Sequence, residues 1–299
     1  MFKNTSSRVT GIIFAIVGIV LFSAKAVMVK MAYTYQIDHL TLLLFRMVFA
    51  LPVYLVIALK NKPAKELNIT KKEYAWLFVF GFLGYYLASL FDFMGLQYLK
   101  AGLERIILFI YPTIVVLISW VFFRKRITNA QTLAIVITYV GVFITFWEEL
   151  GVEEGDSVYY GAFLIFLSAV TYASYLVGSG WLIPKFGTVT FTAYAMLVST
   201  FCVVVHYLFQ GNLEVFHYPK EIYYLGIGMA LFSTIIPSFL VSAAIERLGA
   251  NTFSIFGSLG PISTIILAYF FLAEQISWLQ ILGILVVIMG IAVLSKNKK

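Results

Sequence analysis

Six ionisable side chains lie within or at the edges of long apolar segments, where charge is rare. They are Lys25, Lys30, Arg46, Asp92, Glu104 and Arg105. A charge at the centre of a membrane-spanning helix costs about 2.5–3.5 kcal/mol on insertion scales, so such groups usually face the protein interior and mark a pathway. Four of the six are cations and two are acids. This excess of cations favours a ligand that carries a carboxylate or a phosphate.

Two pairings among these charges are expected. Asp92 should pair with Lys25 or with Arg46, because pairing lowers the cost of removing each charge from water. Such a pair is either a structural bridge or a contact for substrate or gate, and the sequence leaves both open. Glu104 and Arg105 begin an apolar segment at its edge, where they are either solvated or form an outer gate. Asp92 or Glu104 is also a candidate site for a coupling proton.

The spacing of other residues places them on the same predicted pathway through the protein. Glu104, Leu108 and Tyr111 share one helical face, which could lead from the gate to a cavity. Pro112 and Pro261 are expected to bend their helices in the middle of a span, because proline removes a backbone donor. We interpret the two prolines as a pair of bends that line a cavity and gate it. The alternative is that both bends serve only helix packing.

Polar and aromatic side chains complete the candidate substrate site. Asn251, Ser254 and Ser258 follow i, i+3, i+7 and form one polar stripe, which could instead serve helix packing. Ser89, in the third predicted span, is a further candidate for this site. Tyr172 and Tyr175 are the favoured aromatics. The complete set of candidate substrate-binding residues is Lys25, Arg46, Ser89, Asp92, Leu108, Tyr111, Tyr172, Tyr175, Asn251, Ser254 and Ser258.

No enzyme, cofactor or metal motif accompanies these residues. The sequence contains no GxSxG, HExxH, GxGxxG or GxxxxGK[ST] motif. Its three histidines are dispersed, and Cys202 is the only cysteine, so neither a metal site nor an internal disulfide is indicated. We expect a protein that is not an enzyme, needs no cofactor and is driven by a gradient.

The elements that must position these side chains are membrane-spanning helices. The chain has 299 residues, of which 62% are hydrophobic and 12% charged, against about 25% charged in soluble domains. Apolar runs near 20 residues recur, and each can cross a hydrocarbon layer of about 30 Å. We predict an all-α protein with spans at residues 9–32, 39–59, 75–98, 101–123, 129–147, 159–182, 189–209, 221–245, 250–272 and 277–295.

The distribution of basic residues orients these spans. With the N-terminus in the cytoplasm, fifteen Lys and Arg residues fall on the cytoplasmic side and two, Lys100 and Lys220, on the other. Positive charge between short spans marks the cytoplasmic side. We therefore expect a multi-pass protein of the cell (inner) membrane with both termini in the cytoplasm. The net charge of +7 follows from this topology and does not indicate nucleic-acid binding.

The chain also repeats itself. At an offset of 149 residues, Ala101 matches Ala250, Pro112 matches Pro261 and Gly141 matches Gly290, all without a gap. The two repeats, 9–147 and 159–295, hold five predicted spans each. Because five is odd, the second repeat should be inverted in the membrane. Inverted repeats around a central cavity are typical of secondary transporters.

Several segments resemble one family. Gly95-Leu96-Gln97-Tyr98-Leu99-Lys100-Ala101-Gly102-Leu103-Glu104-Arg105, Tyr111-Pro112-Thr113, Phe271-Leu272-Ala273-Glu274-Gln275-Ile276-Ser277 and Arg46 in Phe45-Arg46-Met47 resemble the drug/metabolite transporter superfamily, EamA-like branch. The resemblance covers both repeats and implies ten helices, a central cavity and movement of amino acids or other small metabolites. Glu274 has Lys125 at its place in the first repeat, so a role shared by that glutamate in both halves is in doubt.

The expected function is secondary active transport by alternating access. The substrate is a small molecule, an amino acid or a related zwitterion or anion, and the family analogy favours export across the plasma membrane. An uptake carrier for a larger metabolite such as S-adenosylmethionine is the alternative, and a membrane receptor or scaffold is the alternative of another class. The partners are the lipid bilayer and the substrate, with a proton as a candidate coupling ion, and the protein is a monomer or a homodimer.

Overall fold

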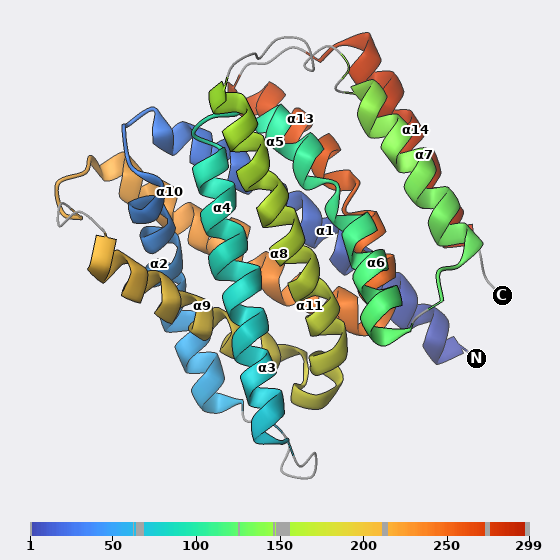
Figure 1. Ribbon diagram of the computed structural model, residues 1–299, viewed down its shortest axis with the longest axis horizontal. Coiled ribbons are helices and arrows are strands. Elements are labelled where there is room, and N and C mark those ends of the chain that lie inside the picture. Colours follow the sequence, from blue (N-terminus) through green and yellow to red (C-terminus); the bar gives the residue numbers. More distant parts are fainter. Residues whose placement is uncertain are drawn as a thin grey trace.

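The structure is a computed structural model in which helices form the whole architecture (Figure 1). It describes residues 2–61, 63, 69–124, 126–145, 147, 156–210, 215–272 and 276–296. No strand occurs in these ranges. Glu274 and Lys125, which we predicted to occupy equivalent places in the two repeats, lie outside the described residues.

The first half of the chain forms seven α-helices and one π-helix. Their bounds are α1 (Phe2–Tyr33), α2 (His39–Lys60), α3 (Lys71–Gly81), η2 (Phe82–Leu87), α4 (Ala88–Gly95), α5 (Ala101–Leu108), α6 (Tyr111–Phe123) and α7 (Asn129–Thr145). The second half repeats this order. Its bounds are α8 (Asp156–Phe186), α9 (Thr188–Gln210), α10 (Lys220–Ala230), η3 (Leu231–Ile235), α11 (Ile236–Leu248), α12 (Ala250–Phe256), α13 (Leu259–Leu272) and α14 (Trp278–Lys296).

Seven helical stretches among the described residues are long and apolar enough to cross a membrane. They are Ser7–Tyr33, His39–Lys60, Lys71–Gly95, Ser157–Phe186, Thr188–Gln210, Lys220–Leu248 and Ala250–Phe271. Three shorter apolar helices, Tyr111–Phe123, Asn129–Ile144 and Trp278–Val293, accompany them. The protein is therefore an all-helical multi-pass membrane protein, and the count of ten crossings stays a prediction.

Irregular backbone recurs at the repeat offset. The π-helix η2 begins at Phe82 and η3 begins at Leu231, which are 149 residues apart. The break between α5 and α6 and the break between α12 and α13 also correspond to within one residue at this offset. Residues 101–123 and 250–272 are thus each two helices, where one bent helix was predicted.

The two prolines lie beside these breaks. Pro112 is in the first turn of α6 and Pro261 is in the first turn of α13. The backbone N–H groups in the first turn of a helix have no acceptor within that helix. Proline, which lacks this N–H, is therefore tolerated there without bending the helix.

The last helices of the two halves pack against each other with reciprocal contacts. A methyl group added at Gly141 would lie 2.7 Å from Val287 Cγ2, and one added at Gly290 would lie 2.7 Å from Thr138 Cγ2. Val287 is the equivalent of Thr138, and Gly290 that of Gly141. Reciprocal contacts of this kind are what the predicted inverted repeat would produce, and Figure 1 shows α7 and α14 running side by side in opposite directions at one edge.

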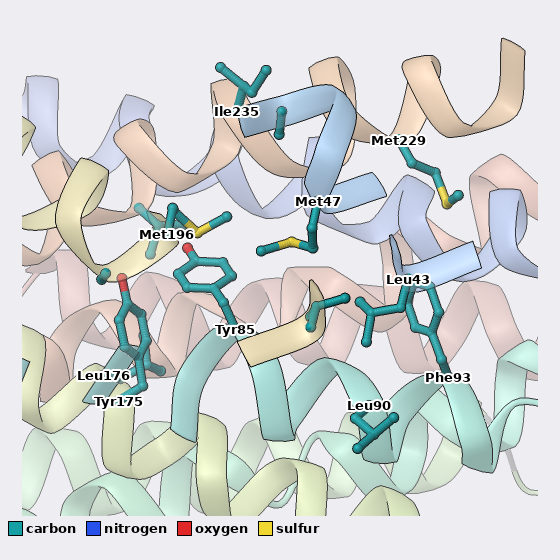
Figure 2. Packing of buried hydrophobic residues seen from close by; sticks show 14 of the residues in the cluster. Leu43, Met47, Tyr85, Leu90, Phe93, Tyr175, Leu176, Met196, Met229 and Ile235 are labelled. Atoms are coloured by element: carbon teal, nitrogen blue, oxygen red, sulfur yellow. The ribbon is translucent and has the colours of Figure 1, made fainter. Parts of the chain in front are cut away.

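One large apolar core joins the remaining helices. Figure 2 shows its centre, where Met47 of α2, Tyr85 of η2, Tyr175 of α8 and Met196 of α9 meet. Large apolar side chains also cover the outside, such as Phe122 at 76% and Phe270 at 73% exposure. A surface of this kind is suited to lipid contact and not to water.

Candidate functional site

A cavity of about 70 Å³ lies between the helices of the two halves. It is lined by Ile19, Phe22, Ser23, Lys25, Gly84, Tyr85, Ala88, Ser89, Arg105, Leu108, Phe109, Tyr111, Ser168, Tyr172, Val241, Phe253, Gly257, Gly260 and Pro261. One water molecule needs about 10–15 Å³ of such space, so this cavity of about 70 Å³ is large enough to hold water. A larger ligand requires the surrounding helices to move apart.

Lys25 and Asp92 form a buried ion pair beside the cavity. The Lys25 Nζ lies 2.7 Å from the Asp92 Oδ2, and the two side chains are 6% and 1% exposed. The pair links α1 to α4. Of the two partners that the sequence left open for Asp92, the structure selects Lys25.

Glu104 and Arg105 form a second buried pair at the start of α5. The Arg105 Nε lies 3.1 Å from the Glu104 Oε2, and Arg105 also donates from Nη2 to the Ser23 carbonyl oxygen at 3.5 Å. Both side chains are at least nine-tenths buried, so a position at the solvated edge is not what the structure shows. Arg105 lines the cavity, and Glu104 lies behind it.

The carboxyl oxygens of Asp92 and Glu104 lack further support. Asp92 and Glu104 interact with each other through a hydrogen bond between their carboxyl groups, and beyond this contact and their ion-pair partners no described group donates to these four oxygens. Buried ion pairs offset the cost of desolvation only when extra hydrogen bonds satisfy the remaining lone pairs. This cluster therefore does not serve stability well, and such under-satisfied charge in a membrane protein indicates function.

Arg46 is the one buried cation of the cluster without an acidic partner among the described residues. It is 1% exposed, donates from Nη2 to Ser89 Oγ at 2.7 Å and lies over the Phe93 ring at 5.1 Å. Its Nε has no hydrogen-bond partner among the described groups. Because Ser89 lines the cavity, Arg46 lies directly behind the cavity wall.

Aromatic rings form the opposite wall. Tyr111 and Tyr172 both line the cavity with their ring centroids 5.4 Å apart. Tyr175 lies one step deeper, with ring centroids 6.3 Å from Tyr172 and 5.0 Å from Tyr85. The Tyr111 hydroxyl fits only because residue 257 is glycine, since a methyl group there would lie 1.4 Å from it.

The predicted polar stripe lies elsewhere. Ser254 and Ser258 donate to the carbonyl oxygens of Asn251 and Ile255 in their own helix, and the Asn251 side chain accepts from Ser119 Oγ at 2.6 Å. None of the three lines the cavity. Pro261 does line it, as do Leu108 and Tyr111, while Pro112 is buried outside it.

Several lining residues were missed by sequence reasoning. Phe22, Ser23 and Tyr85 resemble ordinary membrane-helix residues, and nothing in their types marks them. Gly257 and Gly260 flank the predicted stripe, and only their close approach to Tyr111 and α1 shows that the cavity lies on the glycine side. Among the residues that the structure describes, no cluster of three His, Cys, Asp or Glu side chains could hold a metal ion.

Comparison of the sequence with known proteins finds transporters. The sequence model described as the EamA-like transporter family matches residues 9–147 and 159–296. The uncharacterized transporter YcbK of Bacillus subtilis is 29% identical over 91% of this chain and 88% of its own length. An uncharacterized transporter of Archaeoglobus fulgidus is 24% identical over 85% of this chain and 87% of its own.

A protein of known crystal structure shares the fold. It covers 97% of this chain and all of its own length with a TM-score of 0.76, at 14% identity. At this level of identity the match concerns the arrangement of the helices alone. It shows that the described helices form an arrangement known from experiment.

Proposed function

The chain belongs to the EamA-like transporter family, and we propose that it is a secondary transporter for a small metabolite with a carboxylate group, such as an amino acid. The main support for this proposal is the charge balance at the cavity. Lys25 and Asp92 neutralise each other, as do Glu104 and Arg105, which leaves Arg46 as excess positive charge behind the wall. A buried cation without a counter-ion is costly, and a carboxylate ligand would supply one.

Alternating access follows from the proposed architecture. The reciprocal α7–α14 contact and the recurrence of π-helices and breaks support two inverted halves around the cavity. Discontinuous helices near a central site are typical of such transporters. The cavity has a volume of about 70 Å³, which is smaller than a metabolite needs, so passage of the substrate requires one half to move against the other. Export from the cytoplasm across the cell (inner) membrane remains the favoured direction.

A coupling proton would bind at Asp92 or Glu104. Both carboxyls are buried, each pairs with a cation that lines the cavity, and the two carboxyls form a hydrogen bond with each other that requires a proton. Protonation of either would release its cation to a substrate carboxylate. This links proton movement to substrate binding without any further group.

Transport into proteoliposomes tests the proposal. A panel of labelled amino acids and larger metabolites, with S-adenosylmethionine among them, is offered with and without an imposed proton gradient. We expect saturable uptake of a carboxylate-bearing compound that Arg46→Gln lowers at least tenfold and that the exposed control Lys60→Ala leaves unchanged. Uptake that survives Arg46→Gln would contradict the carboxylate role. Binding without flux for every compound would favour a receptor.

A further inference from the structure

The buried ion pair has an uncharged counterpart in the second half of the chain. Tyr175 is the repeat equivalent of Lys25, on α8 in place of α1. Lys25 contacts Asp92 of α4, and Tyr175 faces Ser242 of α11, the equivalent of α4. The same contact between equivalent helices is therefore ionic in one half and made of hydroxyl groups in the other.

Four hydroxyl groups, which we call the hydroxyl ladder, continue from this contact. They belong to Tyr85, Tyr175, Ser242 and Thr192. Tyr85 lines the cavity, and its ring is 5.0 Å from that of Tyr175, with both hydroxyls directed to the same side in Figure 2. Thr192 Oγ1 lies 2.7 Å from Ser242 Oγ and 2.7 Å from the Thr188 carbonyl oxygen. The ladder thus leads from the cavity wall to the start of α9.

The start of α9 lies at the end of the bundle that carries the basic residues. Thr190 Oγ1 donates to the carbonyl oxygen of Asn61, next to Lys60 at the end of α2, at 3.5 Å. Lys185, just before α9, forms an ion pair with Glu73 at the start of α3. By the distribution of Lys and Arg this is the cytoplasmic end. The ladder and the ion pairs therefore lie on opposite sides of the cavity.

The tyrosine hydroxyls of the ladder are only loosely hydrogen-bonded. Tyr175 is 0% exposed and Tyr85 is 1% exposed, and their hydroxyls interact with each other and with Ser242 without reaching full hydrogen-bond geometry. Burying a hydroxyl without a well-formed hydrogen bond is costly. Two such groups in one row are explained if water or a polar ligand reaches them in another state.

We propose that the hydroxyl ladder is the inner gate of the transporter and the wall of its inner route. The gate opens when α8 separates from α9 and α11, so that water enters between Tyr175, Ser242 and Thr192. Opening this gate separates only neutral groups. This inference rests on the proposed transport function and adds the residues of the inner gate to it.

Cysteine accessibility tests the inner gate without knowledge of the substrate. In a Cys202→Ser background, Ser242→Cys and Thr192→Cys are made singly, and the charged methanethiosulfonate reagent MTSET is added to sealed membrane vesicles of either orientation. Ala244→Cys is the matched control, because Ala244 is on the same helix, is 0% exposed and belongs to the apolar core. Lys60→Cys, at an exposed helix end, reports which face of the vesicle the reagent meets.

The expected result is modification of residues 242 and 192 at least tenfold faster than residue 244, and only from the face where residue 60 reacts. Equal rates at 242, 192 and 244, or reaction from the opposite face, would overturn the proposal. Monodisperse elution of each variant shows that it is folded. If the variants stay unreactive while transport is intact, the gate is wrong and the function stands. If residues 242 and 192 react while no compound is transported, the gate stands and the transport proposal has failed.

Discussion

The Lys25 ammonium lies 2.7 Å from the Asp92 carboxylate, and this contact ties α1 to α4 beside the cavity. Arg46, the other partner that the sequence allowed for Asp92, instead bonds Ser89. The two cations therefore have different tasks. Lys25 is neutralised by Asp92, whereas Arg46 has no ion-pair partner among the described residues.

Removing one member of this pair should cost far more than removing both. Asp92→Asn leaves an unpaired buried ammonium, and loss of one partner from a buried pair typically destabilises by about 3–5 kcal/mol. The double variant Lys25→Met with Asp92→Leu removes both charges and should recover most of that loss. Thermal unfolding in detergent measures both. A double variant no more stable than Asp92→Asn would show that the pair contributes through something other than charge.

The α7–α14 contact predicts equal effects at equivalent glycines. Gly141→Leu and Gly290→Leu each force a side chain into the facing backbone, because even a methyl group would lie 2.9 Å from the Gly283 carbonyl oxygen or 3.2 Å from that of Ala134. Overpacking of this kind costs about 1–3 kcal/mol. Val140→Leu, at a position of α7 that is 50% exposed, should change little. Melting temperatures that fall for one glycine variant only would contradict the predicted inverted repeat.

Much of the architecture could be predicted because hydrophobicity and repetition act along the chain. The apolar runs located every helical stretch, and the 149-residue offset anticipated the equivalence of Gly141 with Gly290. The breaks after Leu108 and Phe256 were not anticipated. Proline was taken to bend a continuous helix, yet Pro112 and Pro261 each lie in a first turn, where no helical hydrogen bond is lost.

The site was predictable to the extent that charge is rare in an apolar chain. Lys25, Arg46, Asp92, Glu104 and Arg105 stand out by type alone, and the structure gathers them near one cavity. The polar stripe on the ninth predicted span was assigned to the substrate site by helical periodicity. Periodicity shows which residues share one face of a helix, but it does not show what that face contacts. Ser254 and Ser258 satisfy their hydroxyls within their own helix, so their polarity gives no information about a ligand.

The start of α3 provides a test away from the cavity. Thr70 and Glu73 form a reciprocal capping box, and Glu73 also pairs with Lys185. Thr70→Ala should cost about 1 kcal/mol, as is typical for loss of an N-cap. Glu73→Gln keeps an acceptor for the Thr70 backbone N–H and removes the charge, so it should cost less than Glu73→Ala. Thermal unfolding compares the three. Equal losses for Glu73→Gln and Glu73→Ala would show that the ion pair outweighs the cap.

Gly257 should be required for the position of Tyr111. A methyl group at residue 257 would lie 1.4 Å from the Tyr111 hydroxyl oxygen and 2.5 Å from its Cζ, so Gly257→Ala must displace the ring. Because Tyr111 packs against Tyr172 in the cavity wall, we expect transport to fall at least tenfold and stability to fall by about 1–3 kcal/mol. Gly260→Ala is the control, since Gly260 also lines the cavity and its nearest neighbour would be 3.7 Å away.

A double-mutant cycle separates the clash at Gly257 from other effects of alanine there. In a Tyr111→Ala background the hydroxyl and the ring are gone, so Gly257→Ala should then cost little further stability. The coupling between two residues in contact typically reaches about 0.5–3 kcal/mol. Additive losses in unfolding temperature would mean that Gly257 is needed for the helix break between α12 and α13 itself. In that case the glycine shapes the backbone, and the position of Tyr111 is set by its packing against Tyr172 and Phe109.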